Sequence, residues 1–200
     1  MWNTVFERLH PGARSSEAEI ARAEAELGFA LPESYRSFCR ECGAGLANGH
    51  FRIATPLPYP AADLVTRAEI IADSINAAIQ ALSAADTPHR FSIEDGDLSR
   101  LERACFFGEG DDGSFLFWDV QGSFSDEDRA GEYPIWVMAP DLETVRFGGD
   151  TLDAFFKRTQ GLTILDVLGD GTPPLASTFE GIEAAVLARA GEPEQDGAPA

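Results

Sequence analysis

One apolar stripe constrains the fold of this chain more than any other feature. Four residues recur at i, i+3, i+4 and i+7, the spacing of one face of an α-helix: Tyr35, Phe38, Cys39 and Cys42. Pro32 fits the first helical position, where its missing N–H costs nothing, and Gly43 is suited to end the helix. We therefore expect a helix that buries this stripe against another layer.

The same stripe contains a Cys-x-x-Cys pair, for which a metal site, a redox site and core packing are the alternatives. A structural zinc site usually needs four ligands, and no second cysteine pair or closely spaced histidine pair accompanies Cys39 and Cys42. A redox pair typically lies at a helix N-terminus, whereas these residues fall in the middle and at the end of the predicted helix. We expect core packing, with metal binding or redox chemistry as the alternative.

Amphipathic patterns predict four more helices. Ser16 and Glu19 match a capping box, and Gly28 is suited to end the helix that follows them. The other three are predicted over residues 63–82, from a cap at Asp150 with Leu152, Phe155 and Phe156 on the buried side, and over residues 179–190.

Short apolar and aromatic runs between turn residues predict strands. Residues 104–107 and 114–120, joined by the sequence GEGDDG, have the pattern of a β-hairpin. Further strands are predicted at residues 51–54, 135–138 and 144–147. Because helices come first, strands follow and helices return, we predict the α+β class, a mainly antiparallel sheet packed by N-terminal and C-terminal helices.

The chain is long enough for one domain with a sizeable core. We expect this single domain to occupy residues 1–190. The acidic, apolar-poor residues 191–200 have the composition of a disordered tail.

A large excess of negative charge restricts the classes of partner. Asp and Glu number 34 against 15 Lys and Arg, which gives a formal net charge of −19. Such a chain repels nucleic acids and anionic membranes, and it favours basic proteins as partners.

The first residues lack the apolar core of a secretory signal, no apolar run is long enough for a membrane span, and three cysteines indicate reduced thiols. We expect a cytoplasmic protein with a protein partner and no nucleic-acid or membrane partner.

The hairpin turn partly matches two ligand-binding motifs, one for dinucleotides and one for calcium, but it fits neither motif. Gly108 to Gly113 matches G-x-G-x-x-G, but a strand pattern follows it and its three carboxylates would repel phosphate. Its acids, with Asp119 beyond, lack the spacing of a calcium-binding EF-hand loop. No Walker loop, G-x-S-x-G elbow or H-E-x-x-H motif is present. We predict a non-enzyme with no catalytic residues, no cofactor and no metal; a metal-dependent or hydrolytic enzyme is the alternative from another class.

Three blocks of sequence resemble the SUKH superfamily, which includes fungal cell-wall regulators and bacterial immunity proteins. LGFALPESYRSFCRECGAG is similar to its Leu-Pro-x-x-Tyr-x-x-Phe helix, and FFGEGDDGSFLFWD to its glycine-rich turn between two strands, ending at Asp119. IWVMAPDLETVRFGGDTLDAFFKRT is similar to its strand pair and Phe-rich helix. The blocks span about residues 15–161, the expected core, with residues 63–103 as a family-variable insertion.

Two positions depart from the family pattern. The family often has Asn-Gly-Gly where this chain has Cys42-Gly43-Ala44, and an acidic residue where this chain has Ser114. The resemblance therefore implies the fold rather than one subfamily.

What the resemblance implies is binding rather than catalysis, because many bacterial members are thought to be immunity proteins that neutralise a cognate toxin. The expected partner is a basic toxin domain, for example a nuclease; a regulatory or scaffold adaptor without a toxin is the alternative. The family's variable loops are the implied recognition surface, although an acidic loop can also be merely solvated. The expected protein-binding residues are Glu109, Asp111, Asp112, Asp119, Asp126, Glu127 and Asp128.

Overall fold

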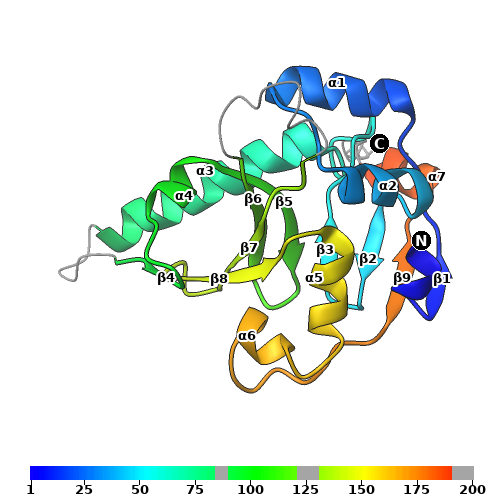
Figure 1. Cartoon of the computed structure of the whole chain (residues 1–200). Coiled ribbons are helices and arrows are strands. Elements are labelled where there is room, and N and C mark those ends of the chain that lie inside the picture. Colours follow the sequence, from blue (N-terminus) through cyan, green and yellow to red (C-terminus); the bar gives the residue numbers. More distant parts are fainter. Residues whose placement is uncertain (84–89, 121–130, 191–200) are drawn as a thin grey trace, which may run out of the picture.

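A mixed β-sheet runs through the molecule and carries helices on both faces (Figure 1). The computed structural model describes residues 1–83, 90–120 and 131–190. The strands in these ranges are β1 (Arg8–His10), β2 (Gly45–Ala47), β3 (Phe51–Ile53), β4 (Ser92–Ile93), β5 (Ala104–Gly110), β6 (Phe115–Asp119), β7 (Ile135–Met138), β8 (Thr144–Gly149) and β9 (Thr178–Gly181). They pair in the order β1–β9–β2–β3–β5–β6–β7–β8–β4.

Neighbouring strands are antiparallel except at the two ends of the sheet. β1 pairs with β9 and β4 pairs with β8 in parallel. The hairpin predicted around GEGDDG is β5–β6, and it contains a register shift between Phe106 and Gly108. The prediction of an α+β domain with a mainly antiparallel sheet is confirmed.

The first face of the sheet is covered by the predicted N-terminal helices and by one C-terminal helix. These are α1 (Glu17–Leu27), α2 (Glu33–Glu41) and α5 (Leu152–Thr159), with a short 3₁₀ turn η1 (Trp2–Thr4) beside them. Tyr35, Phe38, Cys39 and Cys42 have 0% exposure, so the whole predicted stripe is buried. The Tyr35 hydroxyl donates a hydrogen bond of 2.5 Å to the Ala54 carbonyl, which joins α2 to the end of β3.

Both thiols of the Cys-x-x-Cys pair lie in this core. Burial raises the pKa of the Cys42 thiol to about 12 and that of the Cys39 thiol further. A protonated, fully buried thiol behaves as a small apolar group rather than as a nucleophile or a metal ligand. The prediction that this pair packs in the core is confirmed.

The second face carries a separate core under the long helix α3 (Leu64–Ser83), which confirms the helix predicted over residues 63–82. Ile71 and Ile75 of α3 are buried against Phe106, Phe117 and Trp136 of the sheet. The segment that resembles a family-variable insertion thus supplies one of the two covering layers. Throughout the described ranges, no helix combines the length and apolar character that crossing a membrane requires.

Two short elements lie in residues 90–102, after α3. They are β4 and the helix α4 (Ser99–Glu102). β4 contributes only two residues to the sheet, paired with Thr144 and Val145. An element this short shows no periodicity that a sequence pattern can reveal.

The predicted cap of α5 is wrong by one residue. Asp150 is exposed and lies outside the helix, whereas Thr151 is the N-cap and its hydroxyl accepts a hydrogen bond of 3.3 Å from the Ala154 N–H. Aspartate and threonine are both favoured caps, so adjacent candidates cannot be separated by residue type alone. In α1 the prediction is confirmed, because both bonds of the Ser16–Glu19 capping box are present.

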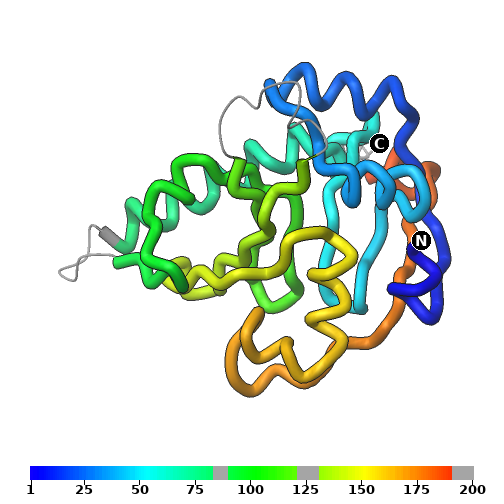
Figure 2. Tube along the Cα trace, viewed as in Figure 1, coloured from blue at the N-terminus to red at the C-terminus, as the bar shows by residue number. Residues whose placement is uncertain are grey.

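The C-terminal prediction is corrected more substantially. Residues 178–181 form β9 rather than the start of a helix, and α7 (Ala184–Ala190) begins only afterwards. β9 is inserted between β1 and β2, two strands from near the opposite end of the chain (Figure 2). A further short helix, α6 (Ile164–Leu168), lies beside β8. The predicted tail, residues 191–200, lies outside the described residues.

Candidate functional site

The turn between β5 and β6 is held in one conformation by its own backbone and by the neighbouring turn between β2 and β3. The Gly110 N–H donates to the Ser114 carbonyl, and the Asp111 N–H donates to the His50 carbonyl at 2.9 Å. Gly113 has a φ of +89°, a left-handed value that favours glycine. Ser114 stands where the family pattern has an acid, and its N–H and hydroxyl both bind the Asp112 carboxylate. The turn is therefore a rigid projection rather than a loose loop.

Each of the three predicted acids in this turn has a basic partner. Glu109 pairs with Arg67 of α3, Asp111 with Arg52 of β3 at 3.3 Å, and Asp112 with His50 at 3.2 Å. The Asp111 and Asp112 side chains retain exposed fractions of 43% and 34%. The surface is thus one of mixed charge, whereas the sequence predicts bare negative charge.

The ionisation of Asp112 is set by its immediate contacts. Partial burial alone would raise the pKa of this carboxyl, but hydrogen bonds from His50 and Ser114 hold it well below the ordinary value. The carboxylate is therefore charged at every physiological pH. It can attract a cation from a partner or stay with His50.

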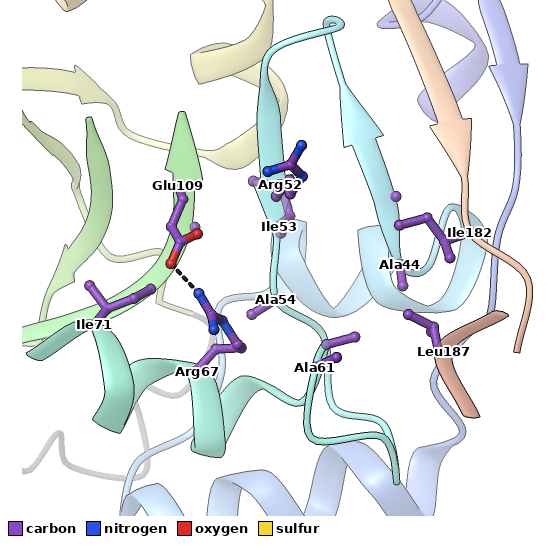
Figure 3. A pocket seen from close by; sticks show the side chains of 13 residues that line it. Ala44, Arg52, Ile53, Ala54, Ala61, Arg67, Ile71, Glu109, Ile182 and Leu187 are labelled. Carbon is purple, nitrogen blue, oxygen red and sulfur yellow. Dashed lines mark hydrogen bonds and ion pairs between the residues drawn. The ribbon is translucent and has the colours of Figure 1, made fainter. Parts of the chain in front are cut away.

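A cavity of about 250 Å³ opens beside the turn, between the start of α3 and the sheet (Figure 3). Arg67 and Glu109 point toward each other on one side of it, and Ile182 and Leu187 lie on the opposite side. A second hollow of about 300 Å³ shares Arg67 and Glu109 and extends toward the turn. Five further residues with small or apolar side chains line the 250 Å³ cavity: Ala44, Ile53, Ala54, Ala61 and Ile71. An apolar side chain fits such a cavity, with polar groups at its rim.

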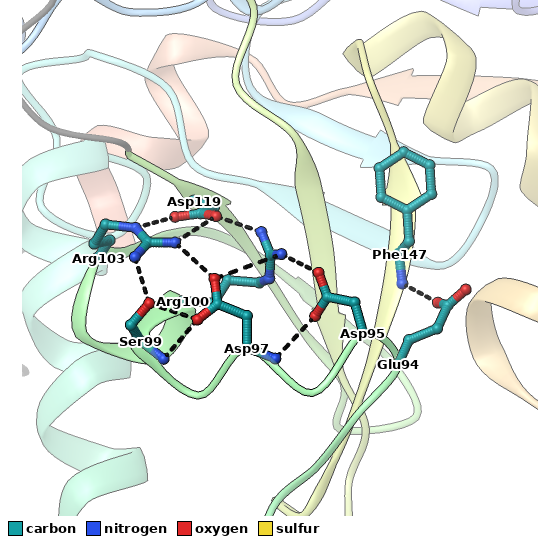
Figure 4. Close-up of polar contacts among 8 residues, drawn as sticks. All are labelled: Glu94, Asp95, Asp97, Ser99, Arg100, Arg103, Asp119 and Phe147. Atoms are coloured by element: carbon teal, nitrogen blue, oxygen red, sulfur yellow. Dashed lines mark hydrogen bonds and ion pairs between the residues drawn. The ribbon is translucent and has the colours of Figure 1, made fainter.

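Asp119 does not belong to this surface, although the sequence groups it with the turn. Its side chain has 0% exposure and lies between two guanidinium groups at the far end of β6 (Figure 4). Arg103 donates from Nε at 2.6 Å and from Nη2 at 3.0 Å, and Arg100 donates from Nη1. The expectation that Asp119 contacts a partner is corrected, because a fully buried carboxylate presents no surface.

Arg100 and Arg103 link Asp119 to further acids in an ion-pair network that the sequence did not predict. Asp95 and Asp97 bind the same two guanidinium groups from the preceding turn. Arg100 also lies over the Trp136 ring, with its guanidinium carbon 3.9 Å from the ring centroid. The available signal was two arginines three residues apart after Asp-x-Asp, a pattern typical of an i, i+3 helical face.

The remaining predicted residues, Asp126, Glu127 and Asp128, lie outside the described residues and stay predictions. The chain that follows them is anchored to α2. Glu132 accepts hydrogen bonds from the Ser34 N–H at 2.7 Å and from the Ser34 hydroxyl at 2.6 Å. Glu132 is therefore held next to α2.

Comparison with known proteins identifies one family. The family model of SMI1 / KNR4 (SUKH-1) matches residues 14–158, which include the hairpin, α3 and the Asp119 network. A search of curated proteins finds no match to this sequence. Across the described ranges, no group of three or more His, Cys, Asp or Glu side chains is placed to hold a metal ion.

Proposed function

Because the chain belongs to the SMI1 / KNR4 family (SUKH-1), we propose that it is a protein-binding module that acts as an immunity protein. In this role it neutralises a cognate bacterial toxin domain by direct binding and catalyses no reaction. The observation that carries the proposal is the rigid hairpin turn beside an apolar cavity. Protein interfaces commonly join an apolar anchor pocket to a polar rim.

The charge of the chain supports a basic partner such as a nuclease domain. A nuclease grips its substrate with a positive cleft, and a protein with a net charge of −19 is electrostatically complementary to such a surface. Since Glu109, Asp111 and Asp112 are already paired, we attribute the long-range attraction to the whole chain and the local specificity to the turn.

The first experiment is to express the full chain together with the protein encoded beside it and to purify the complex. A toxin domain as the partner supports the immunity role, whereas an ordinary cellular protein supports the regulatory or scaffold adaptor. Association is then measured at increasing salt concentration. The on-rate should fall as salt screens the attraction, and an on-rate independent of salt would reject electrostatic steering.

A matched pair of variants tests whether the cavity is the contact site. Ala61 is exposed and lines the cavity, so Ala61→Trp should fill it and weaken binding. Ala25 is also exposed and lies on α1, so Ala25→Trp should leave affinity unchanged. Equal affinities for the two variants would exclude the cavity while leaving the family role intact.

A further inference from the structure

Two arginines differ from the other buried or half-buried arginines of the described residues. The other five have a carboxylate oxygen within 4.0 Å of a guanidinium nitrogen: Arg36, Arg40, Arg67, Arg100 and Arg103. Arg146 and Arg158 are also half-buried, but in the part of the chain that the structure describes neither has such a partner. Both line the same open cavity of about 490 Å³, next to β8 and α6.

Backbone carbonyls lie against one of the two guanidinium groups and a glycine lies against the other. Arg158 on α5 donates from Nη1 to the carbonyls of Phe147 and Gly148, each at 2.9 Å. Arg146 packs on Gly169, where a Cβ atom would lie only 3.2 Å from its Nη2 atom. The Arg158 cation is thus fixed at the cavity before any ligand arrives, which lowers the ordering cost of binding.

The two cations repel each other across one partly desolvated cavity, and neither of the two described carboxylates that line it lies within 4.0 Å of a guanidinium nitrogen. The chain has acids in large excess, yet none forms an ion pair with either arginine among the described residues. We propose that this cavity binds the phosphate group of a small phosphorylated metabolite. This site is independent of the proposed toxin-binding surface, because it lies on β8 and α6 rather than beside the β5–β6 turn.

The arrangement favours phosphate over carboxylate. A phosphate carries more negative charge and more acceptor oxygens than a carboxylate, so it can compensate both guanidinium groups and still accept hydrogen bonds from other donors. The hydroxyl-bearing residues Ser92 and Thr144 line the same cavity. Its volume lies within the range of ligand pockets, roughly 300–1,000 Å³, so a ligand larger than free phosphate can enter.

Acidic residues near the cavity restrict which chemical groups the ligand can have besides its phosphate. Glu94 and Asp166 line the cavity, and Glu94 accepts a hydrogen bond of 2.7 Å from the Phe147 N–H. Asp141 lies in the field of Arg146, and its carboxylate is bound by the N–H groups of Glu143 and Thr144. These carboxylates would repel a second anionic group and accept hydrogen bonds from hydroxyls. A sugar phosphate therefore fits the cavity better than a polyanion.

The test is an NMR titration of the full chain with inorganic phosphate, against sodium chloride at equal ionic strength, followed by glucose 6-phosphate as the larger probe. We expect saturable shifts of the Arg146 and Arg158 Nε–H signals and of β8 amides. Arg146→Gln should weaken phosphate binding by about tenfold or more, because it removes charge-assisted hydrogen bonds. Arg14 is an exposed arginine outside every ion pair of the described residues, so Arg14→Gln should have no effect.

Arg158→Lys provides a second variant that keeps the positive charge, and it should weaken binding by losing the planar fork. Shifts that fail to saturate in the unmodified chain, or that persist unchanged in Arg146→Gln, would overturn the site. Glucose 6-phosphate binding no more tightly than inorganic phosphate would overturn the ligand class, because the cavity would then contribute nothing beyond the two cations.

Discussion

Aspartates at the two ends of one hairpin differ in their burial and in their partners. Asp111 and Asp112 in the turn are partly exposed, and each has one basic partner. Asp119, seven residues after Asp112, is fully buried and accepts from two arginines. The difference shows that burial and the number of partners, rather than residue type or spacing, decide whether an acid stabilises the fold or is available to a ligand.

The buried and the exposed aspartates differ because removing a charge from water costs free energy. A buried carboxylate is tolerated only where charged donors replace its hydration, as Arg100 and Arg103 do for Asp119. An exposed carboxylate keeps most of its hydration, so its ion pair contributes little to stability and can be exchanged for a partner's cation. The turn acids are therefore available to a ligand, whereas the Asp119 network holds α4 against β6.

The largest contrast is expected on truncation of each acid. Asp119→Ala should destabilise the fold by about 3–5 kcal/mol, because it leaves two partly buried guanidinium groups without their shared anion. Asp111→Ala should change the free energy of unfolding by no more than about 0.5 kcal/mol. Urea denaturation of both variants measures the difference. Similar losses for the two would mean that burial does not separate the two aspartates.

The interaction energy of the ion pair should also be larger for the buried acid than for the exposed one. In double-mutant cycles, Arg103 and Asp119 should show an interaction energy of about 1–3 kcal/mol. Arg52 and Asp111, with exposed fractions of 66% and 43%, should show about 0.2–1 kcal/mol. Denaturation midpoints of the two single variants and the double variant give each cycle. A stronger coupling in the exposed pair would invert the comparison.

Sequence patterns revealed the first core because its elements are long and periodic. The Tyr35 stripe, the Ser16 capping box and the β5–β6 hairpin each depend on neighbours within a few residues, so local spacing specifies them. The same holds for α3, although its role as cover of the second face follows only from the packing of Ile71 and Ile75.

The features that the sequence could not reveal depend on distant contacts. β9 is a strand because Thr178 and Phe179 pair with Arg8 and Leu9, about 170 residues away, and this pairing overrides a local pattern that resembled a helix. Asp119 is structural because Arg100 reaches it across the α4 turn. Acidic residues look alike in a sequence, so their roles emerge only once burial is known.

A pH titration sharpens the comparison within the turn itself. The pKa of Asp112 lies below its ordinary value of 3.8, so the ionised form contributes stability above that value and loses it as pH falls through the folded-state pKa. Asp112→Asn should therefore be less stable than the unmodified chain near pH 6, by about 1 kcal/mol or less, and the gap should close toward pH 2. Urea midpoints between pH 2 and pH 6 measure the gap, and a constant gap would exclude linkage to this carboxyl.

The smallest stability effect, and the most informative for function, is expected from Asp111→Asn. The side chain is exposed and its pair with Arg52 is weak, so the free energy of unfolding should move by less than about 0.5 kcal/mol. The substitution also leaves Arg52 unpaired, which adds local positive charge where a basic partner is proposed to dock. Stopped-flow association with the purified partner should therefore show a slower on-rate at low salt, and the difference should vanish at high salt. Because the control Asp150→Asn removes one exposed acid far from the turn in sequence, an equal slowing in both variants would assign the effect to net charge alone.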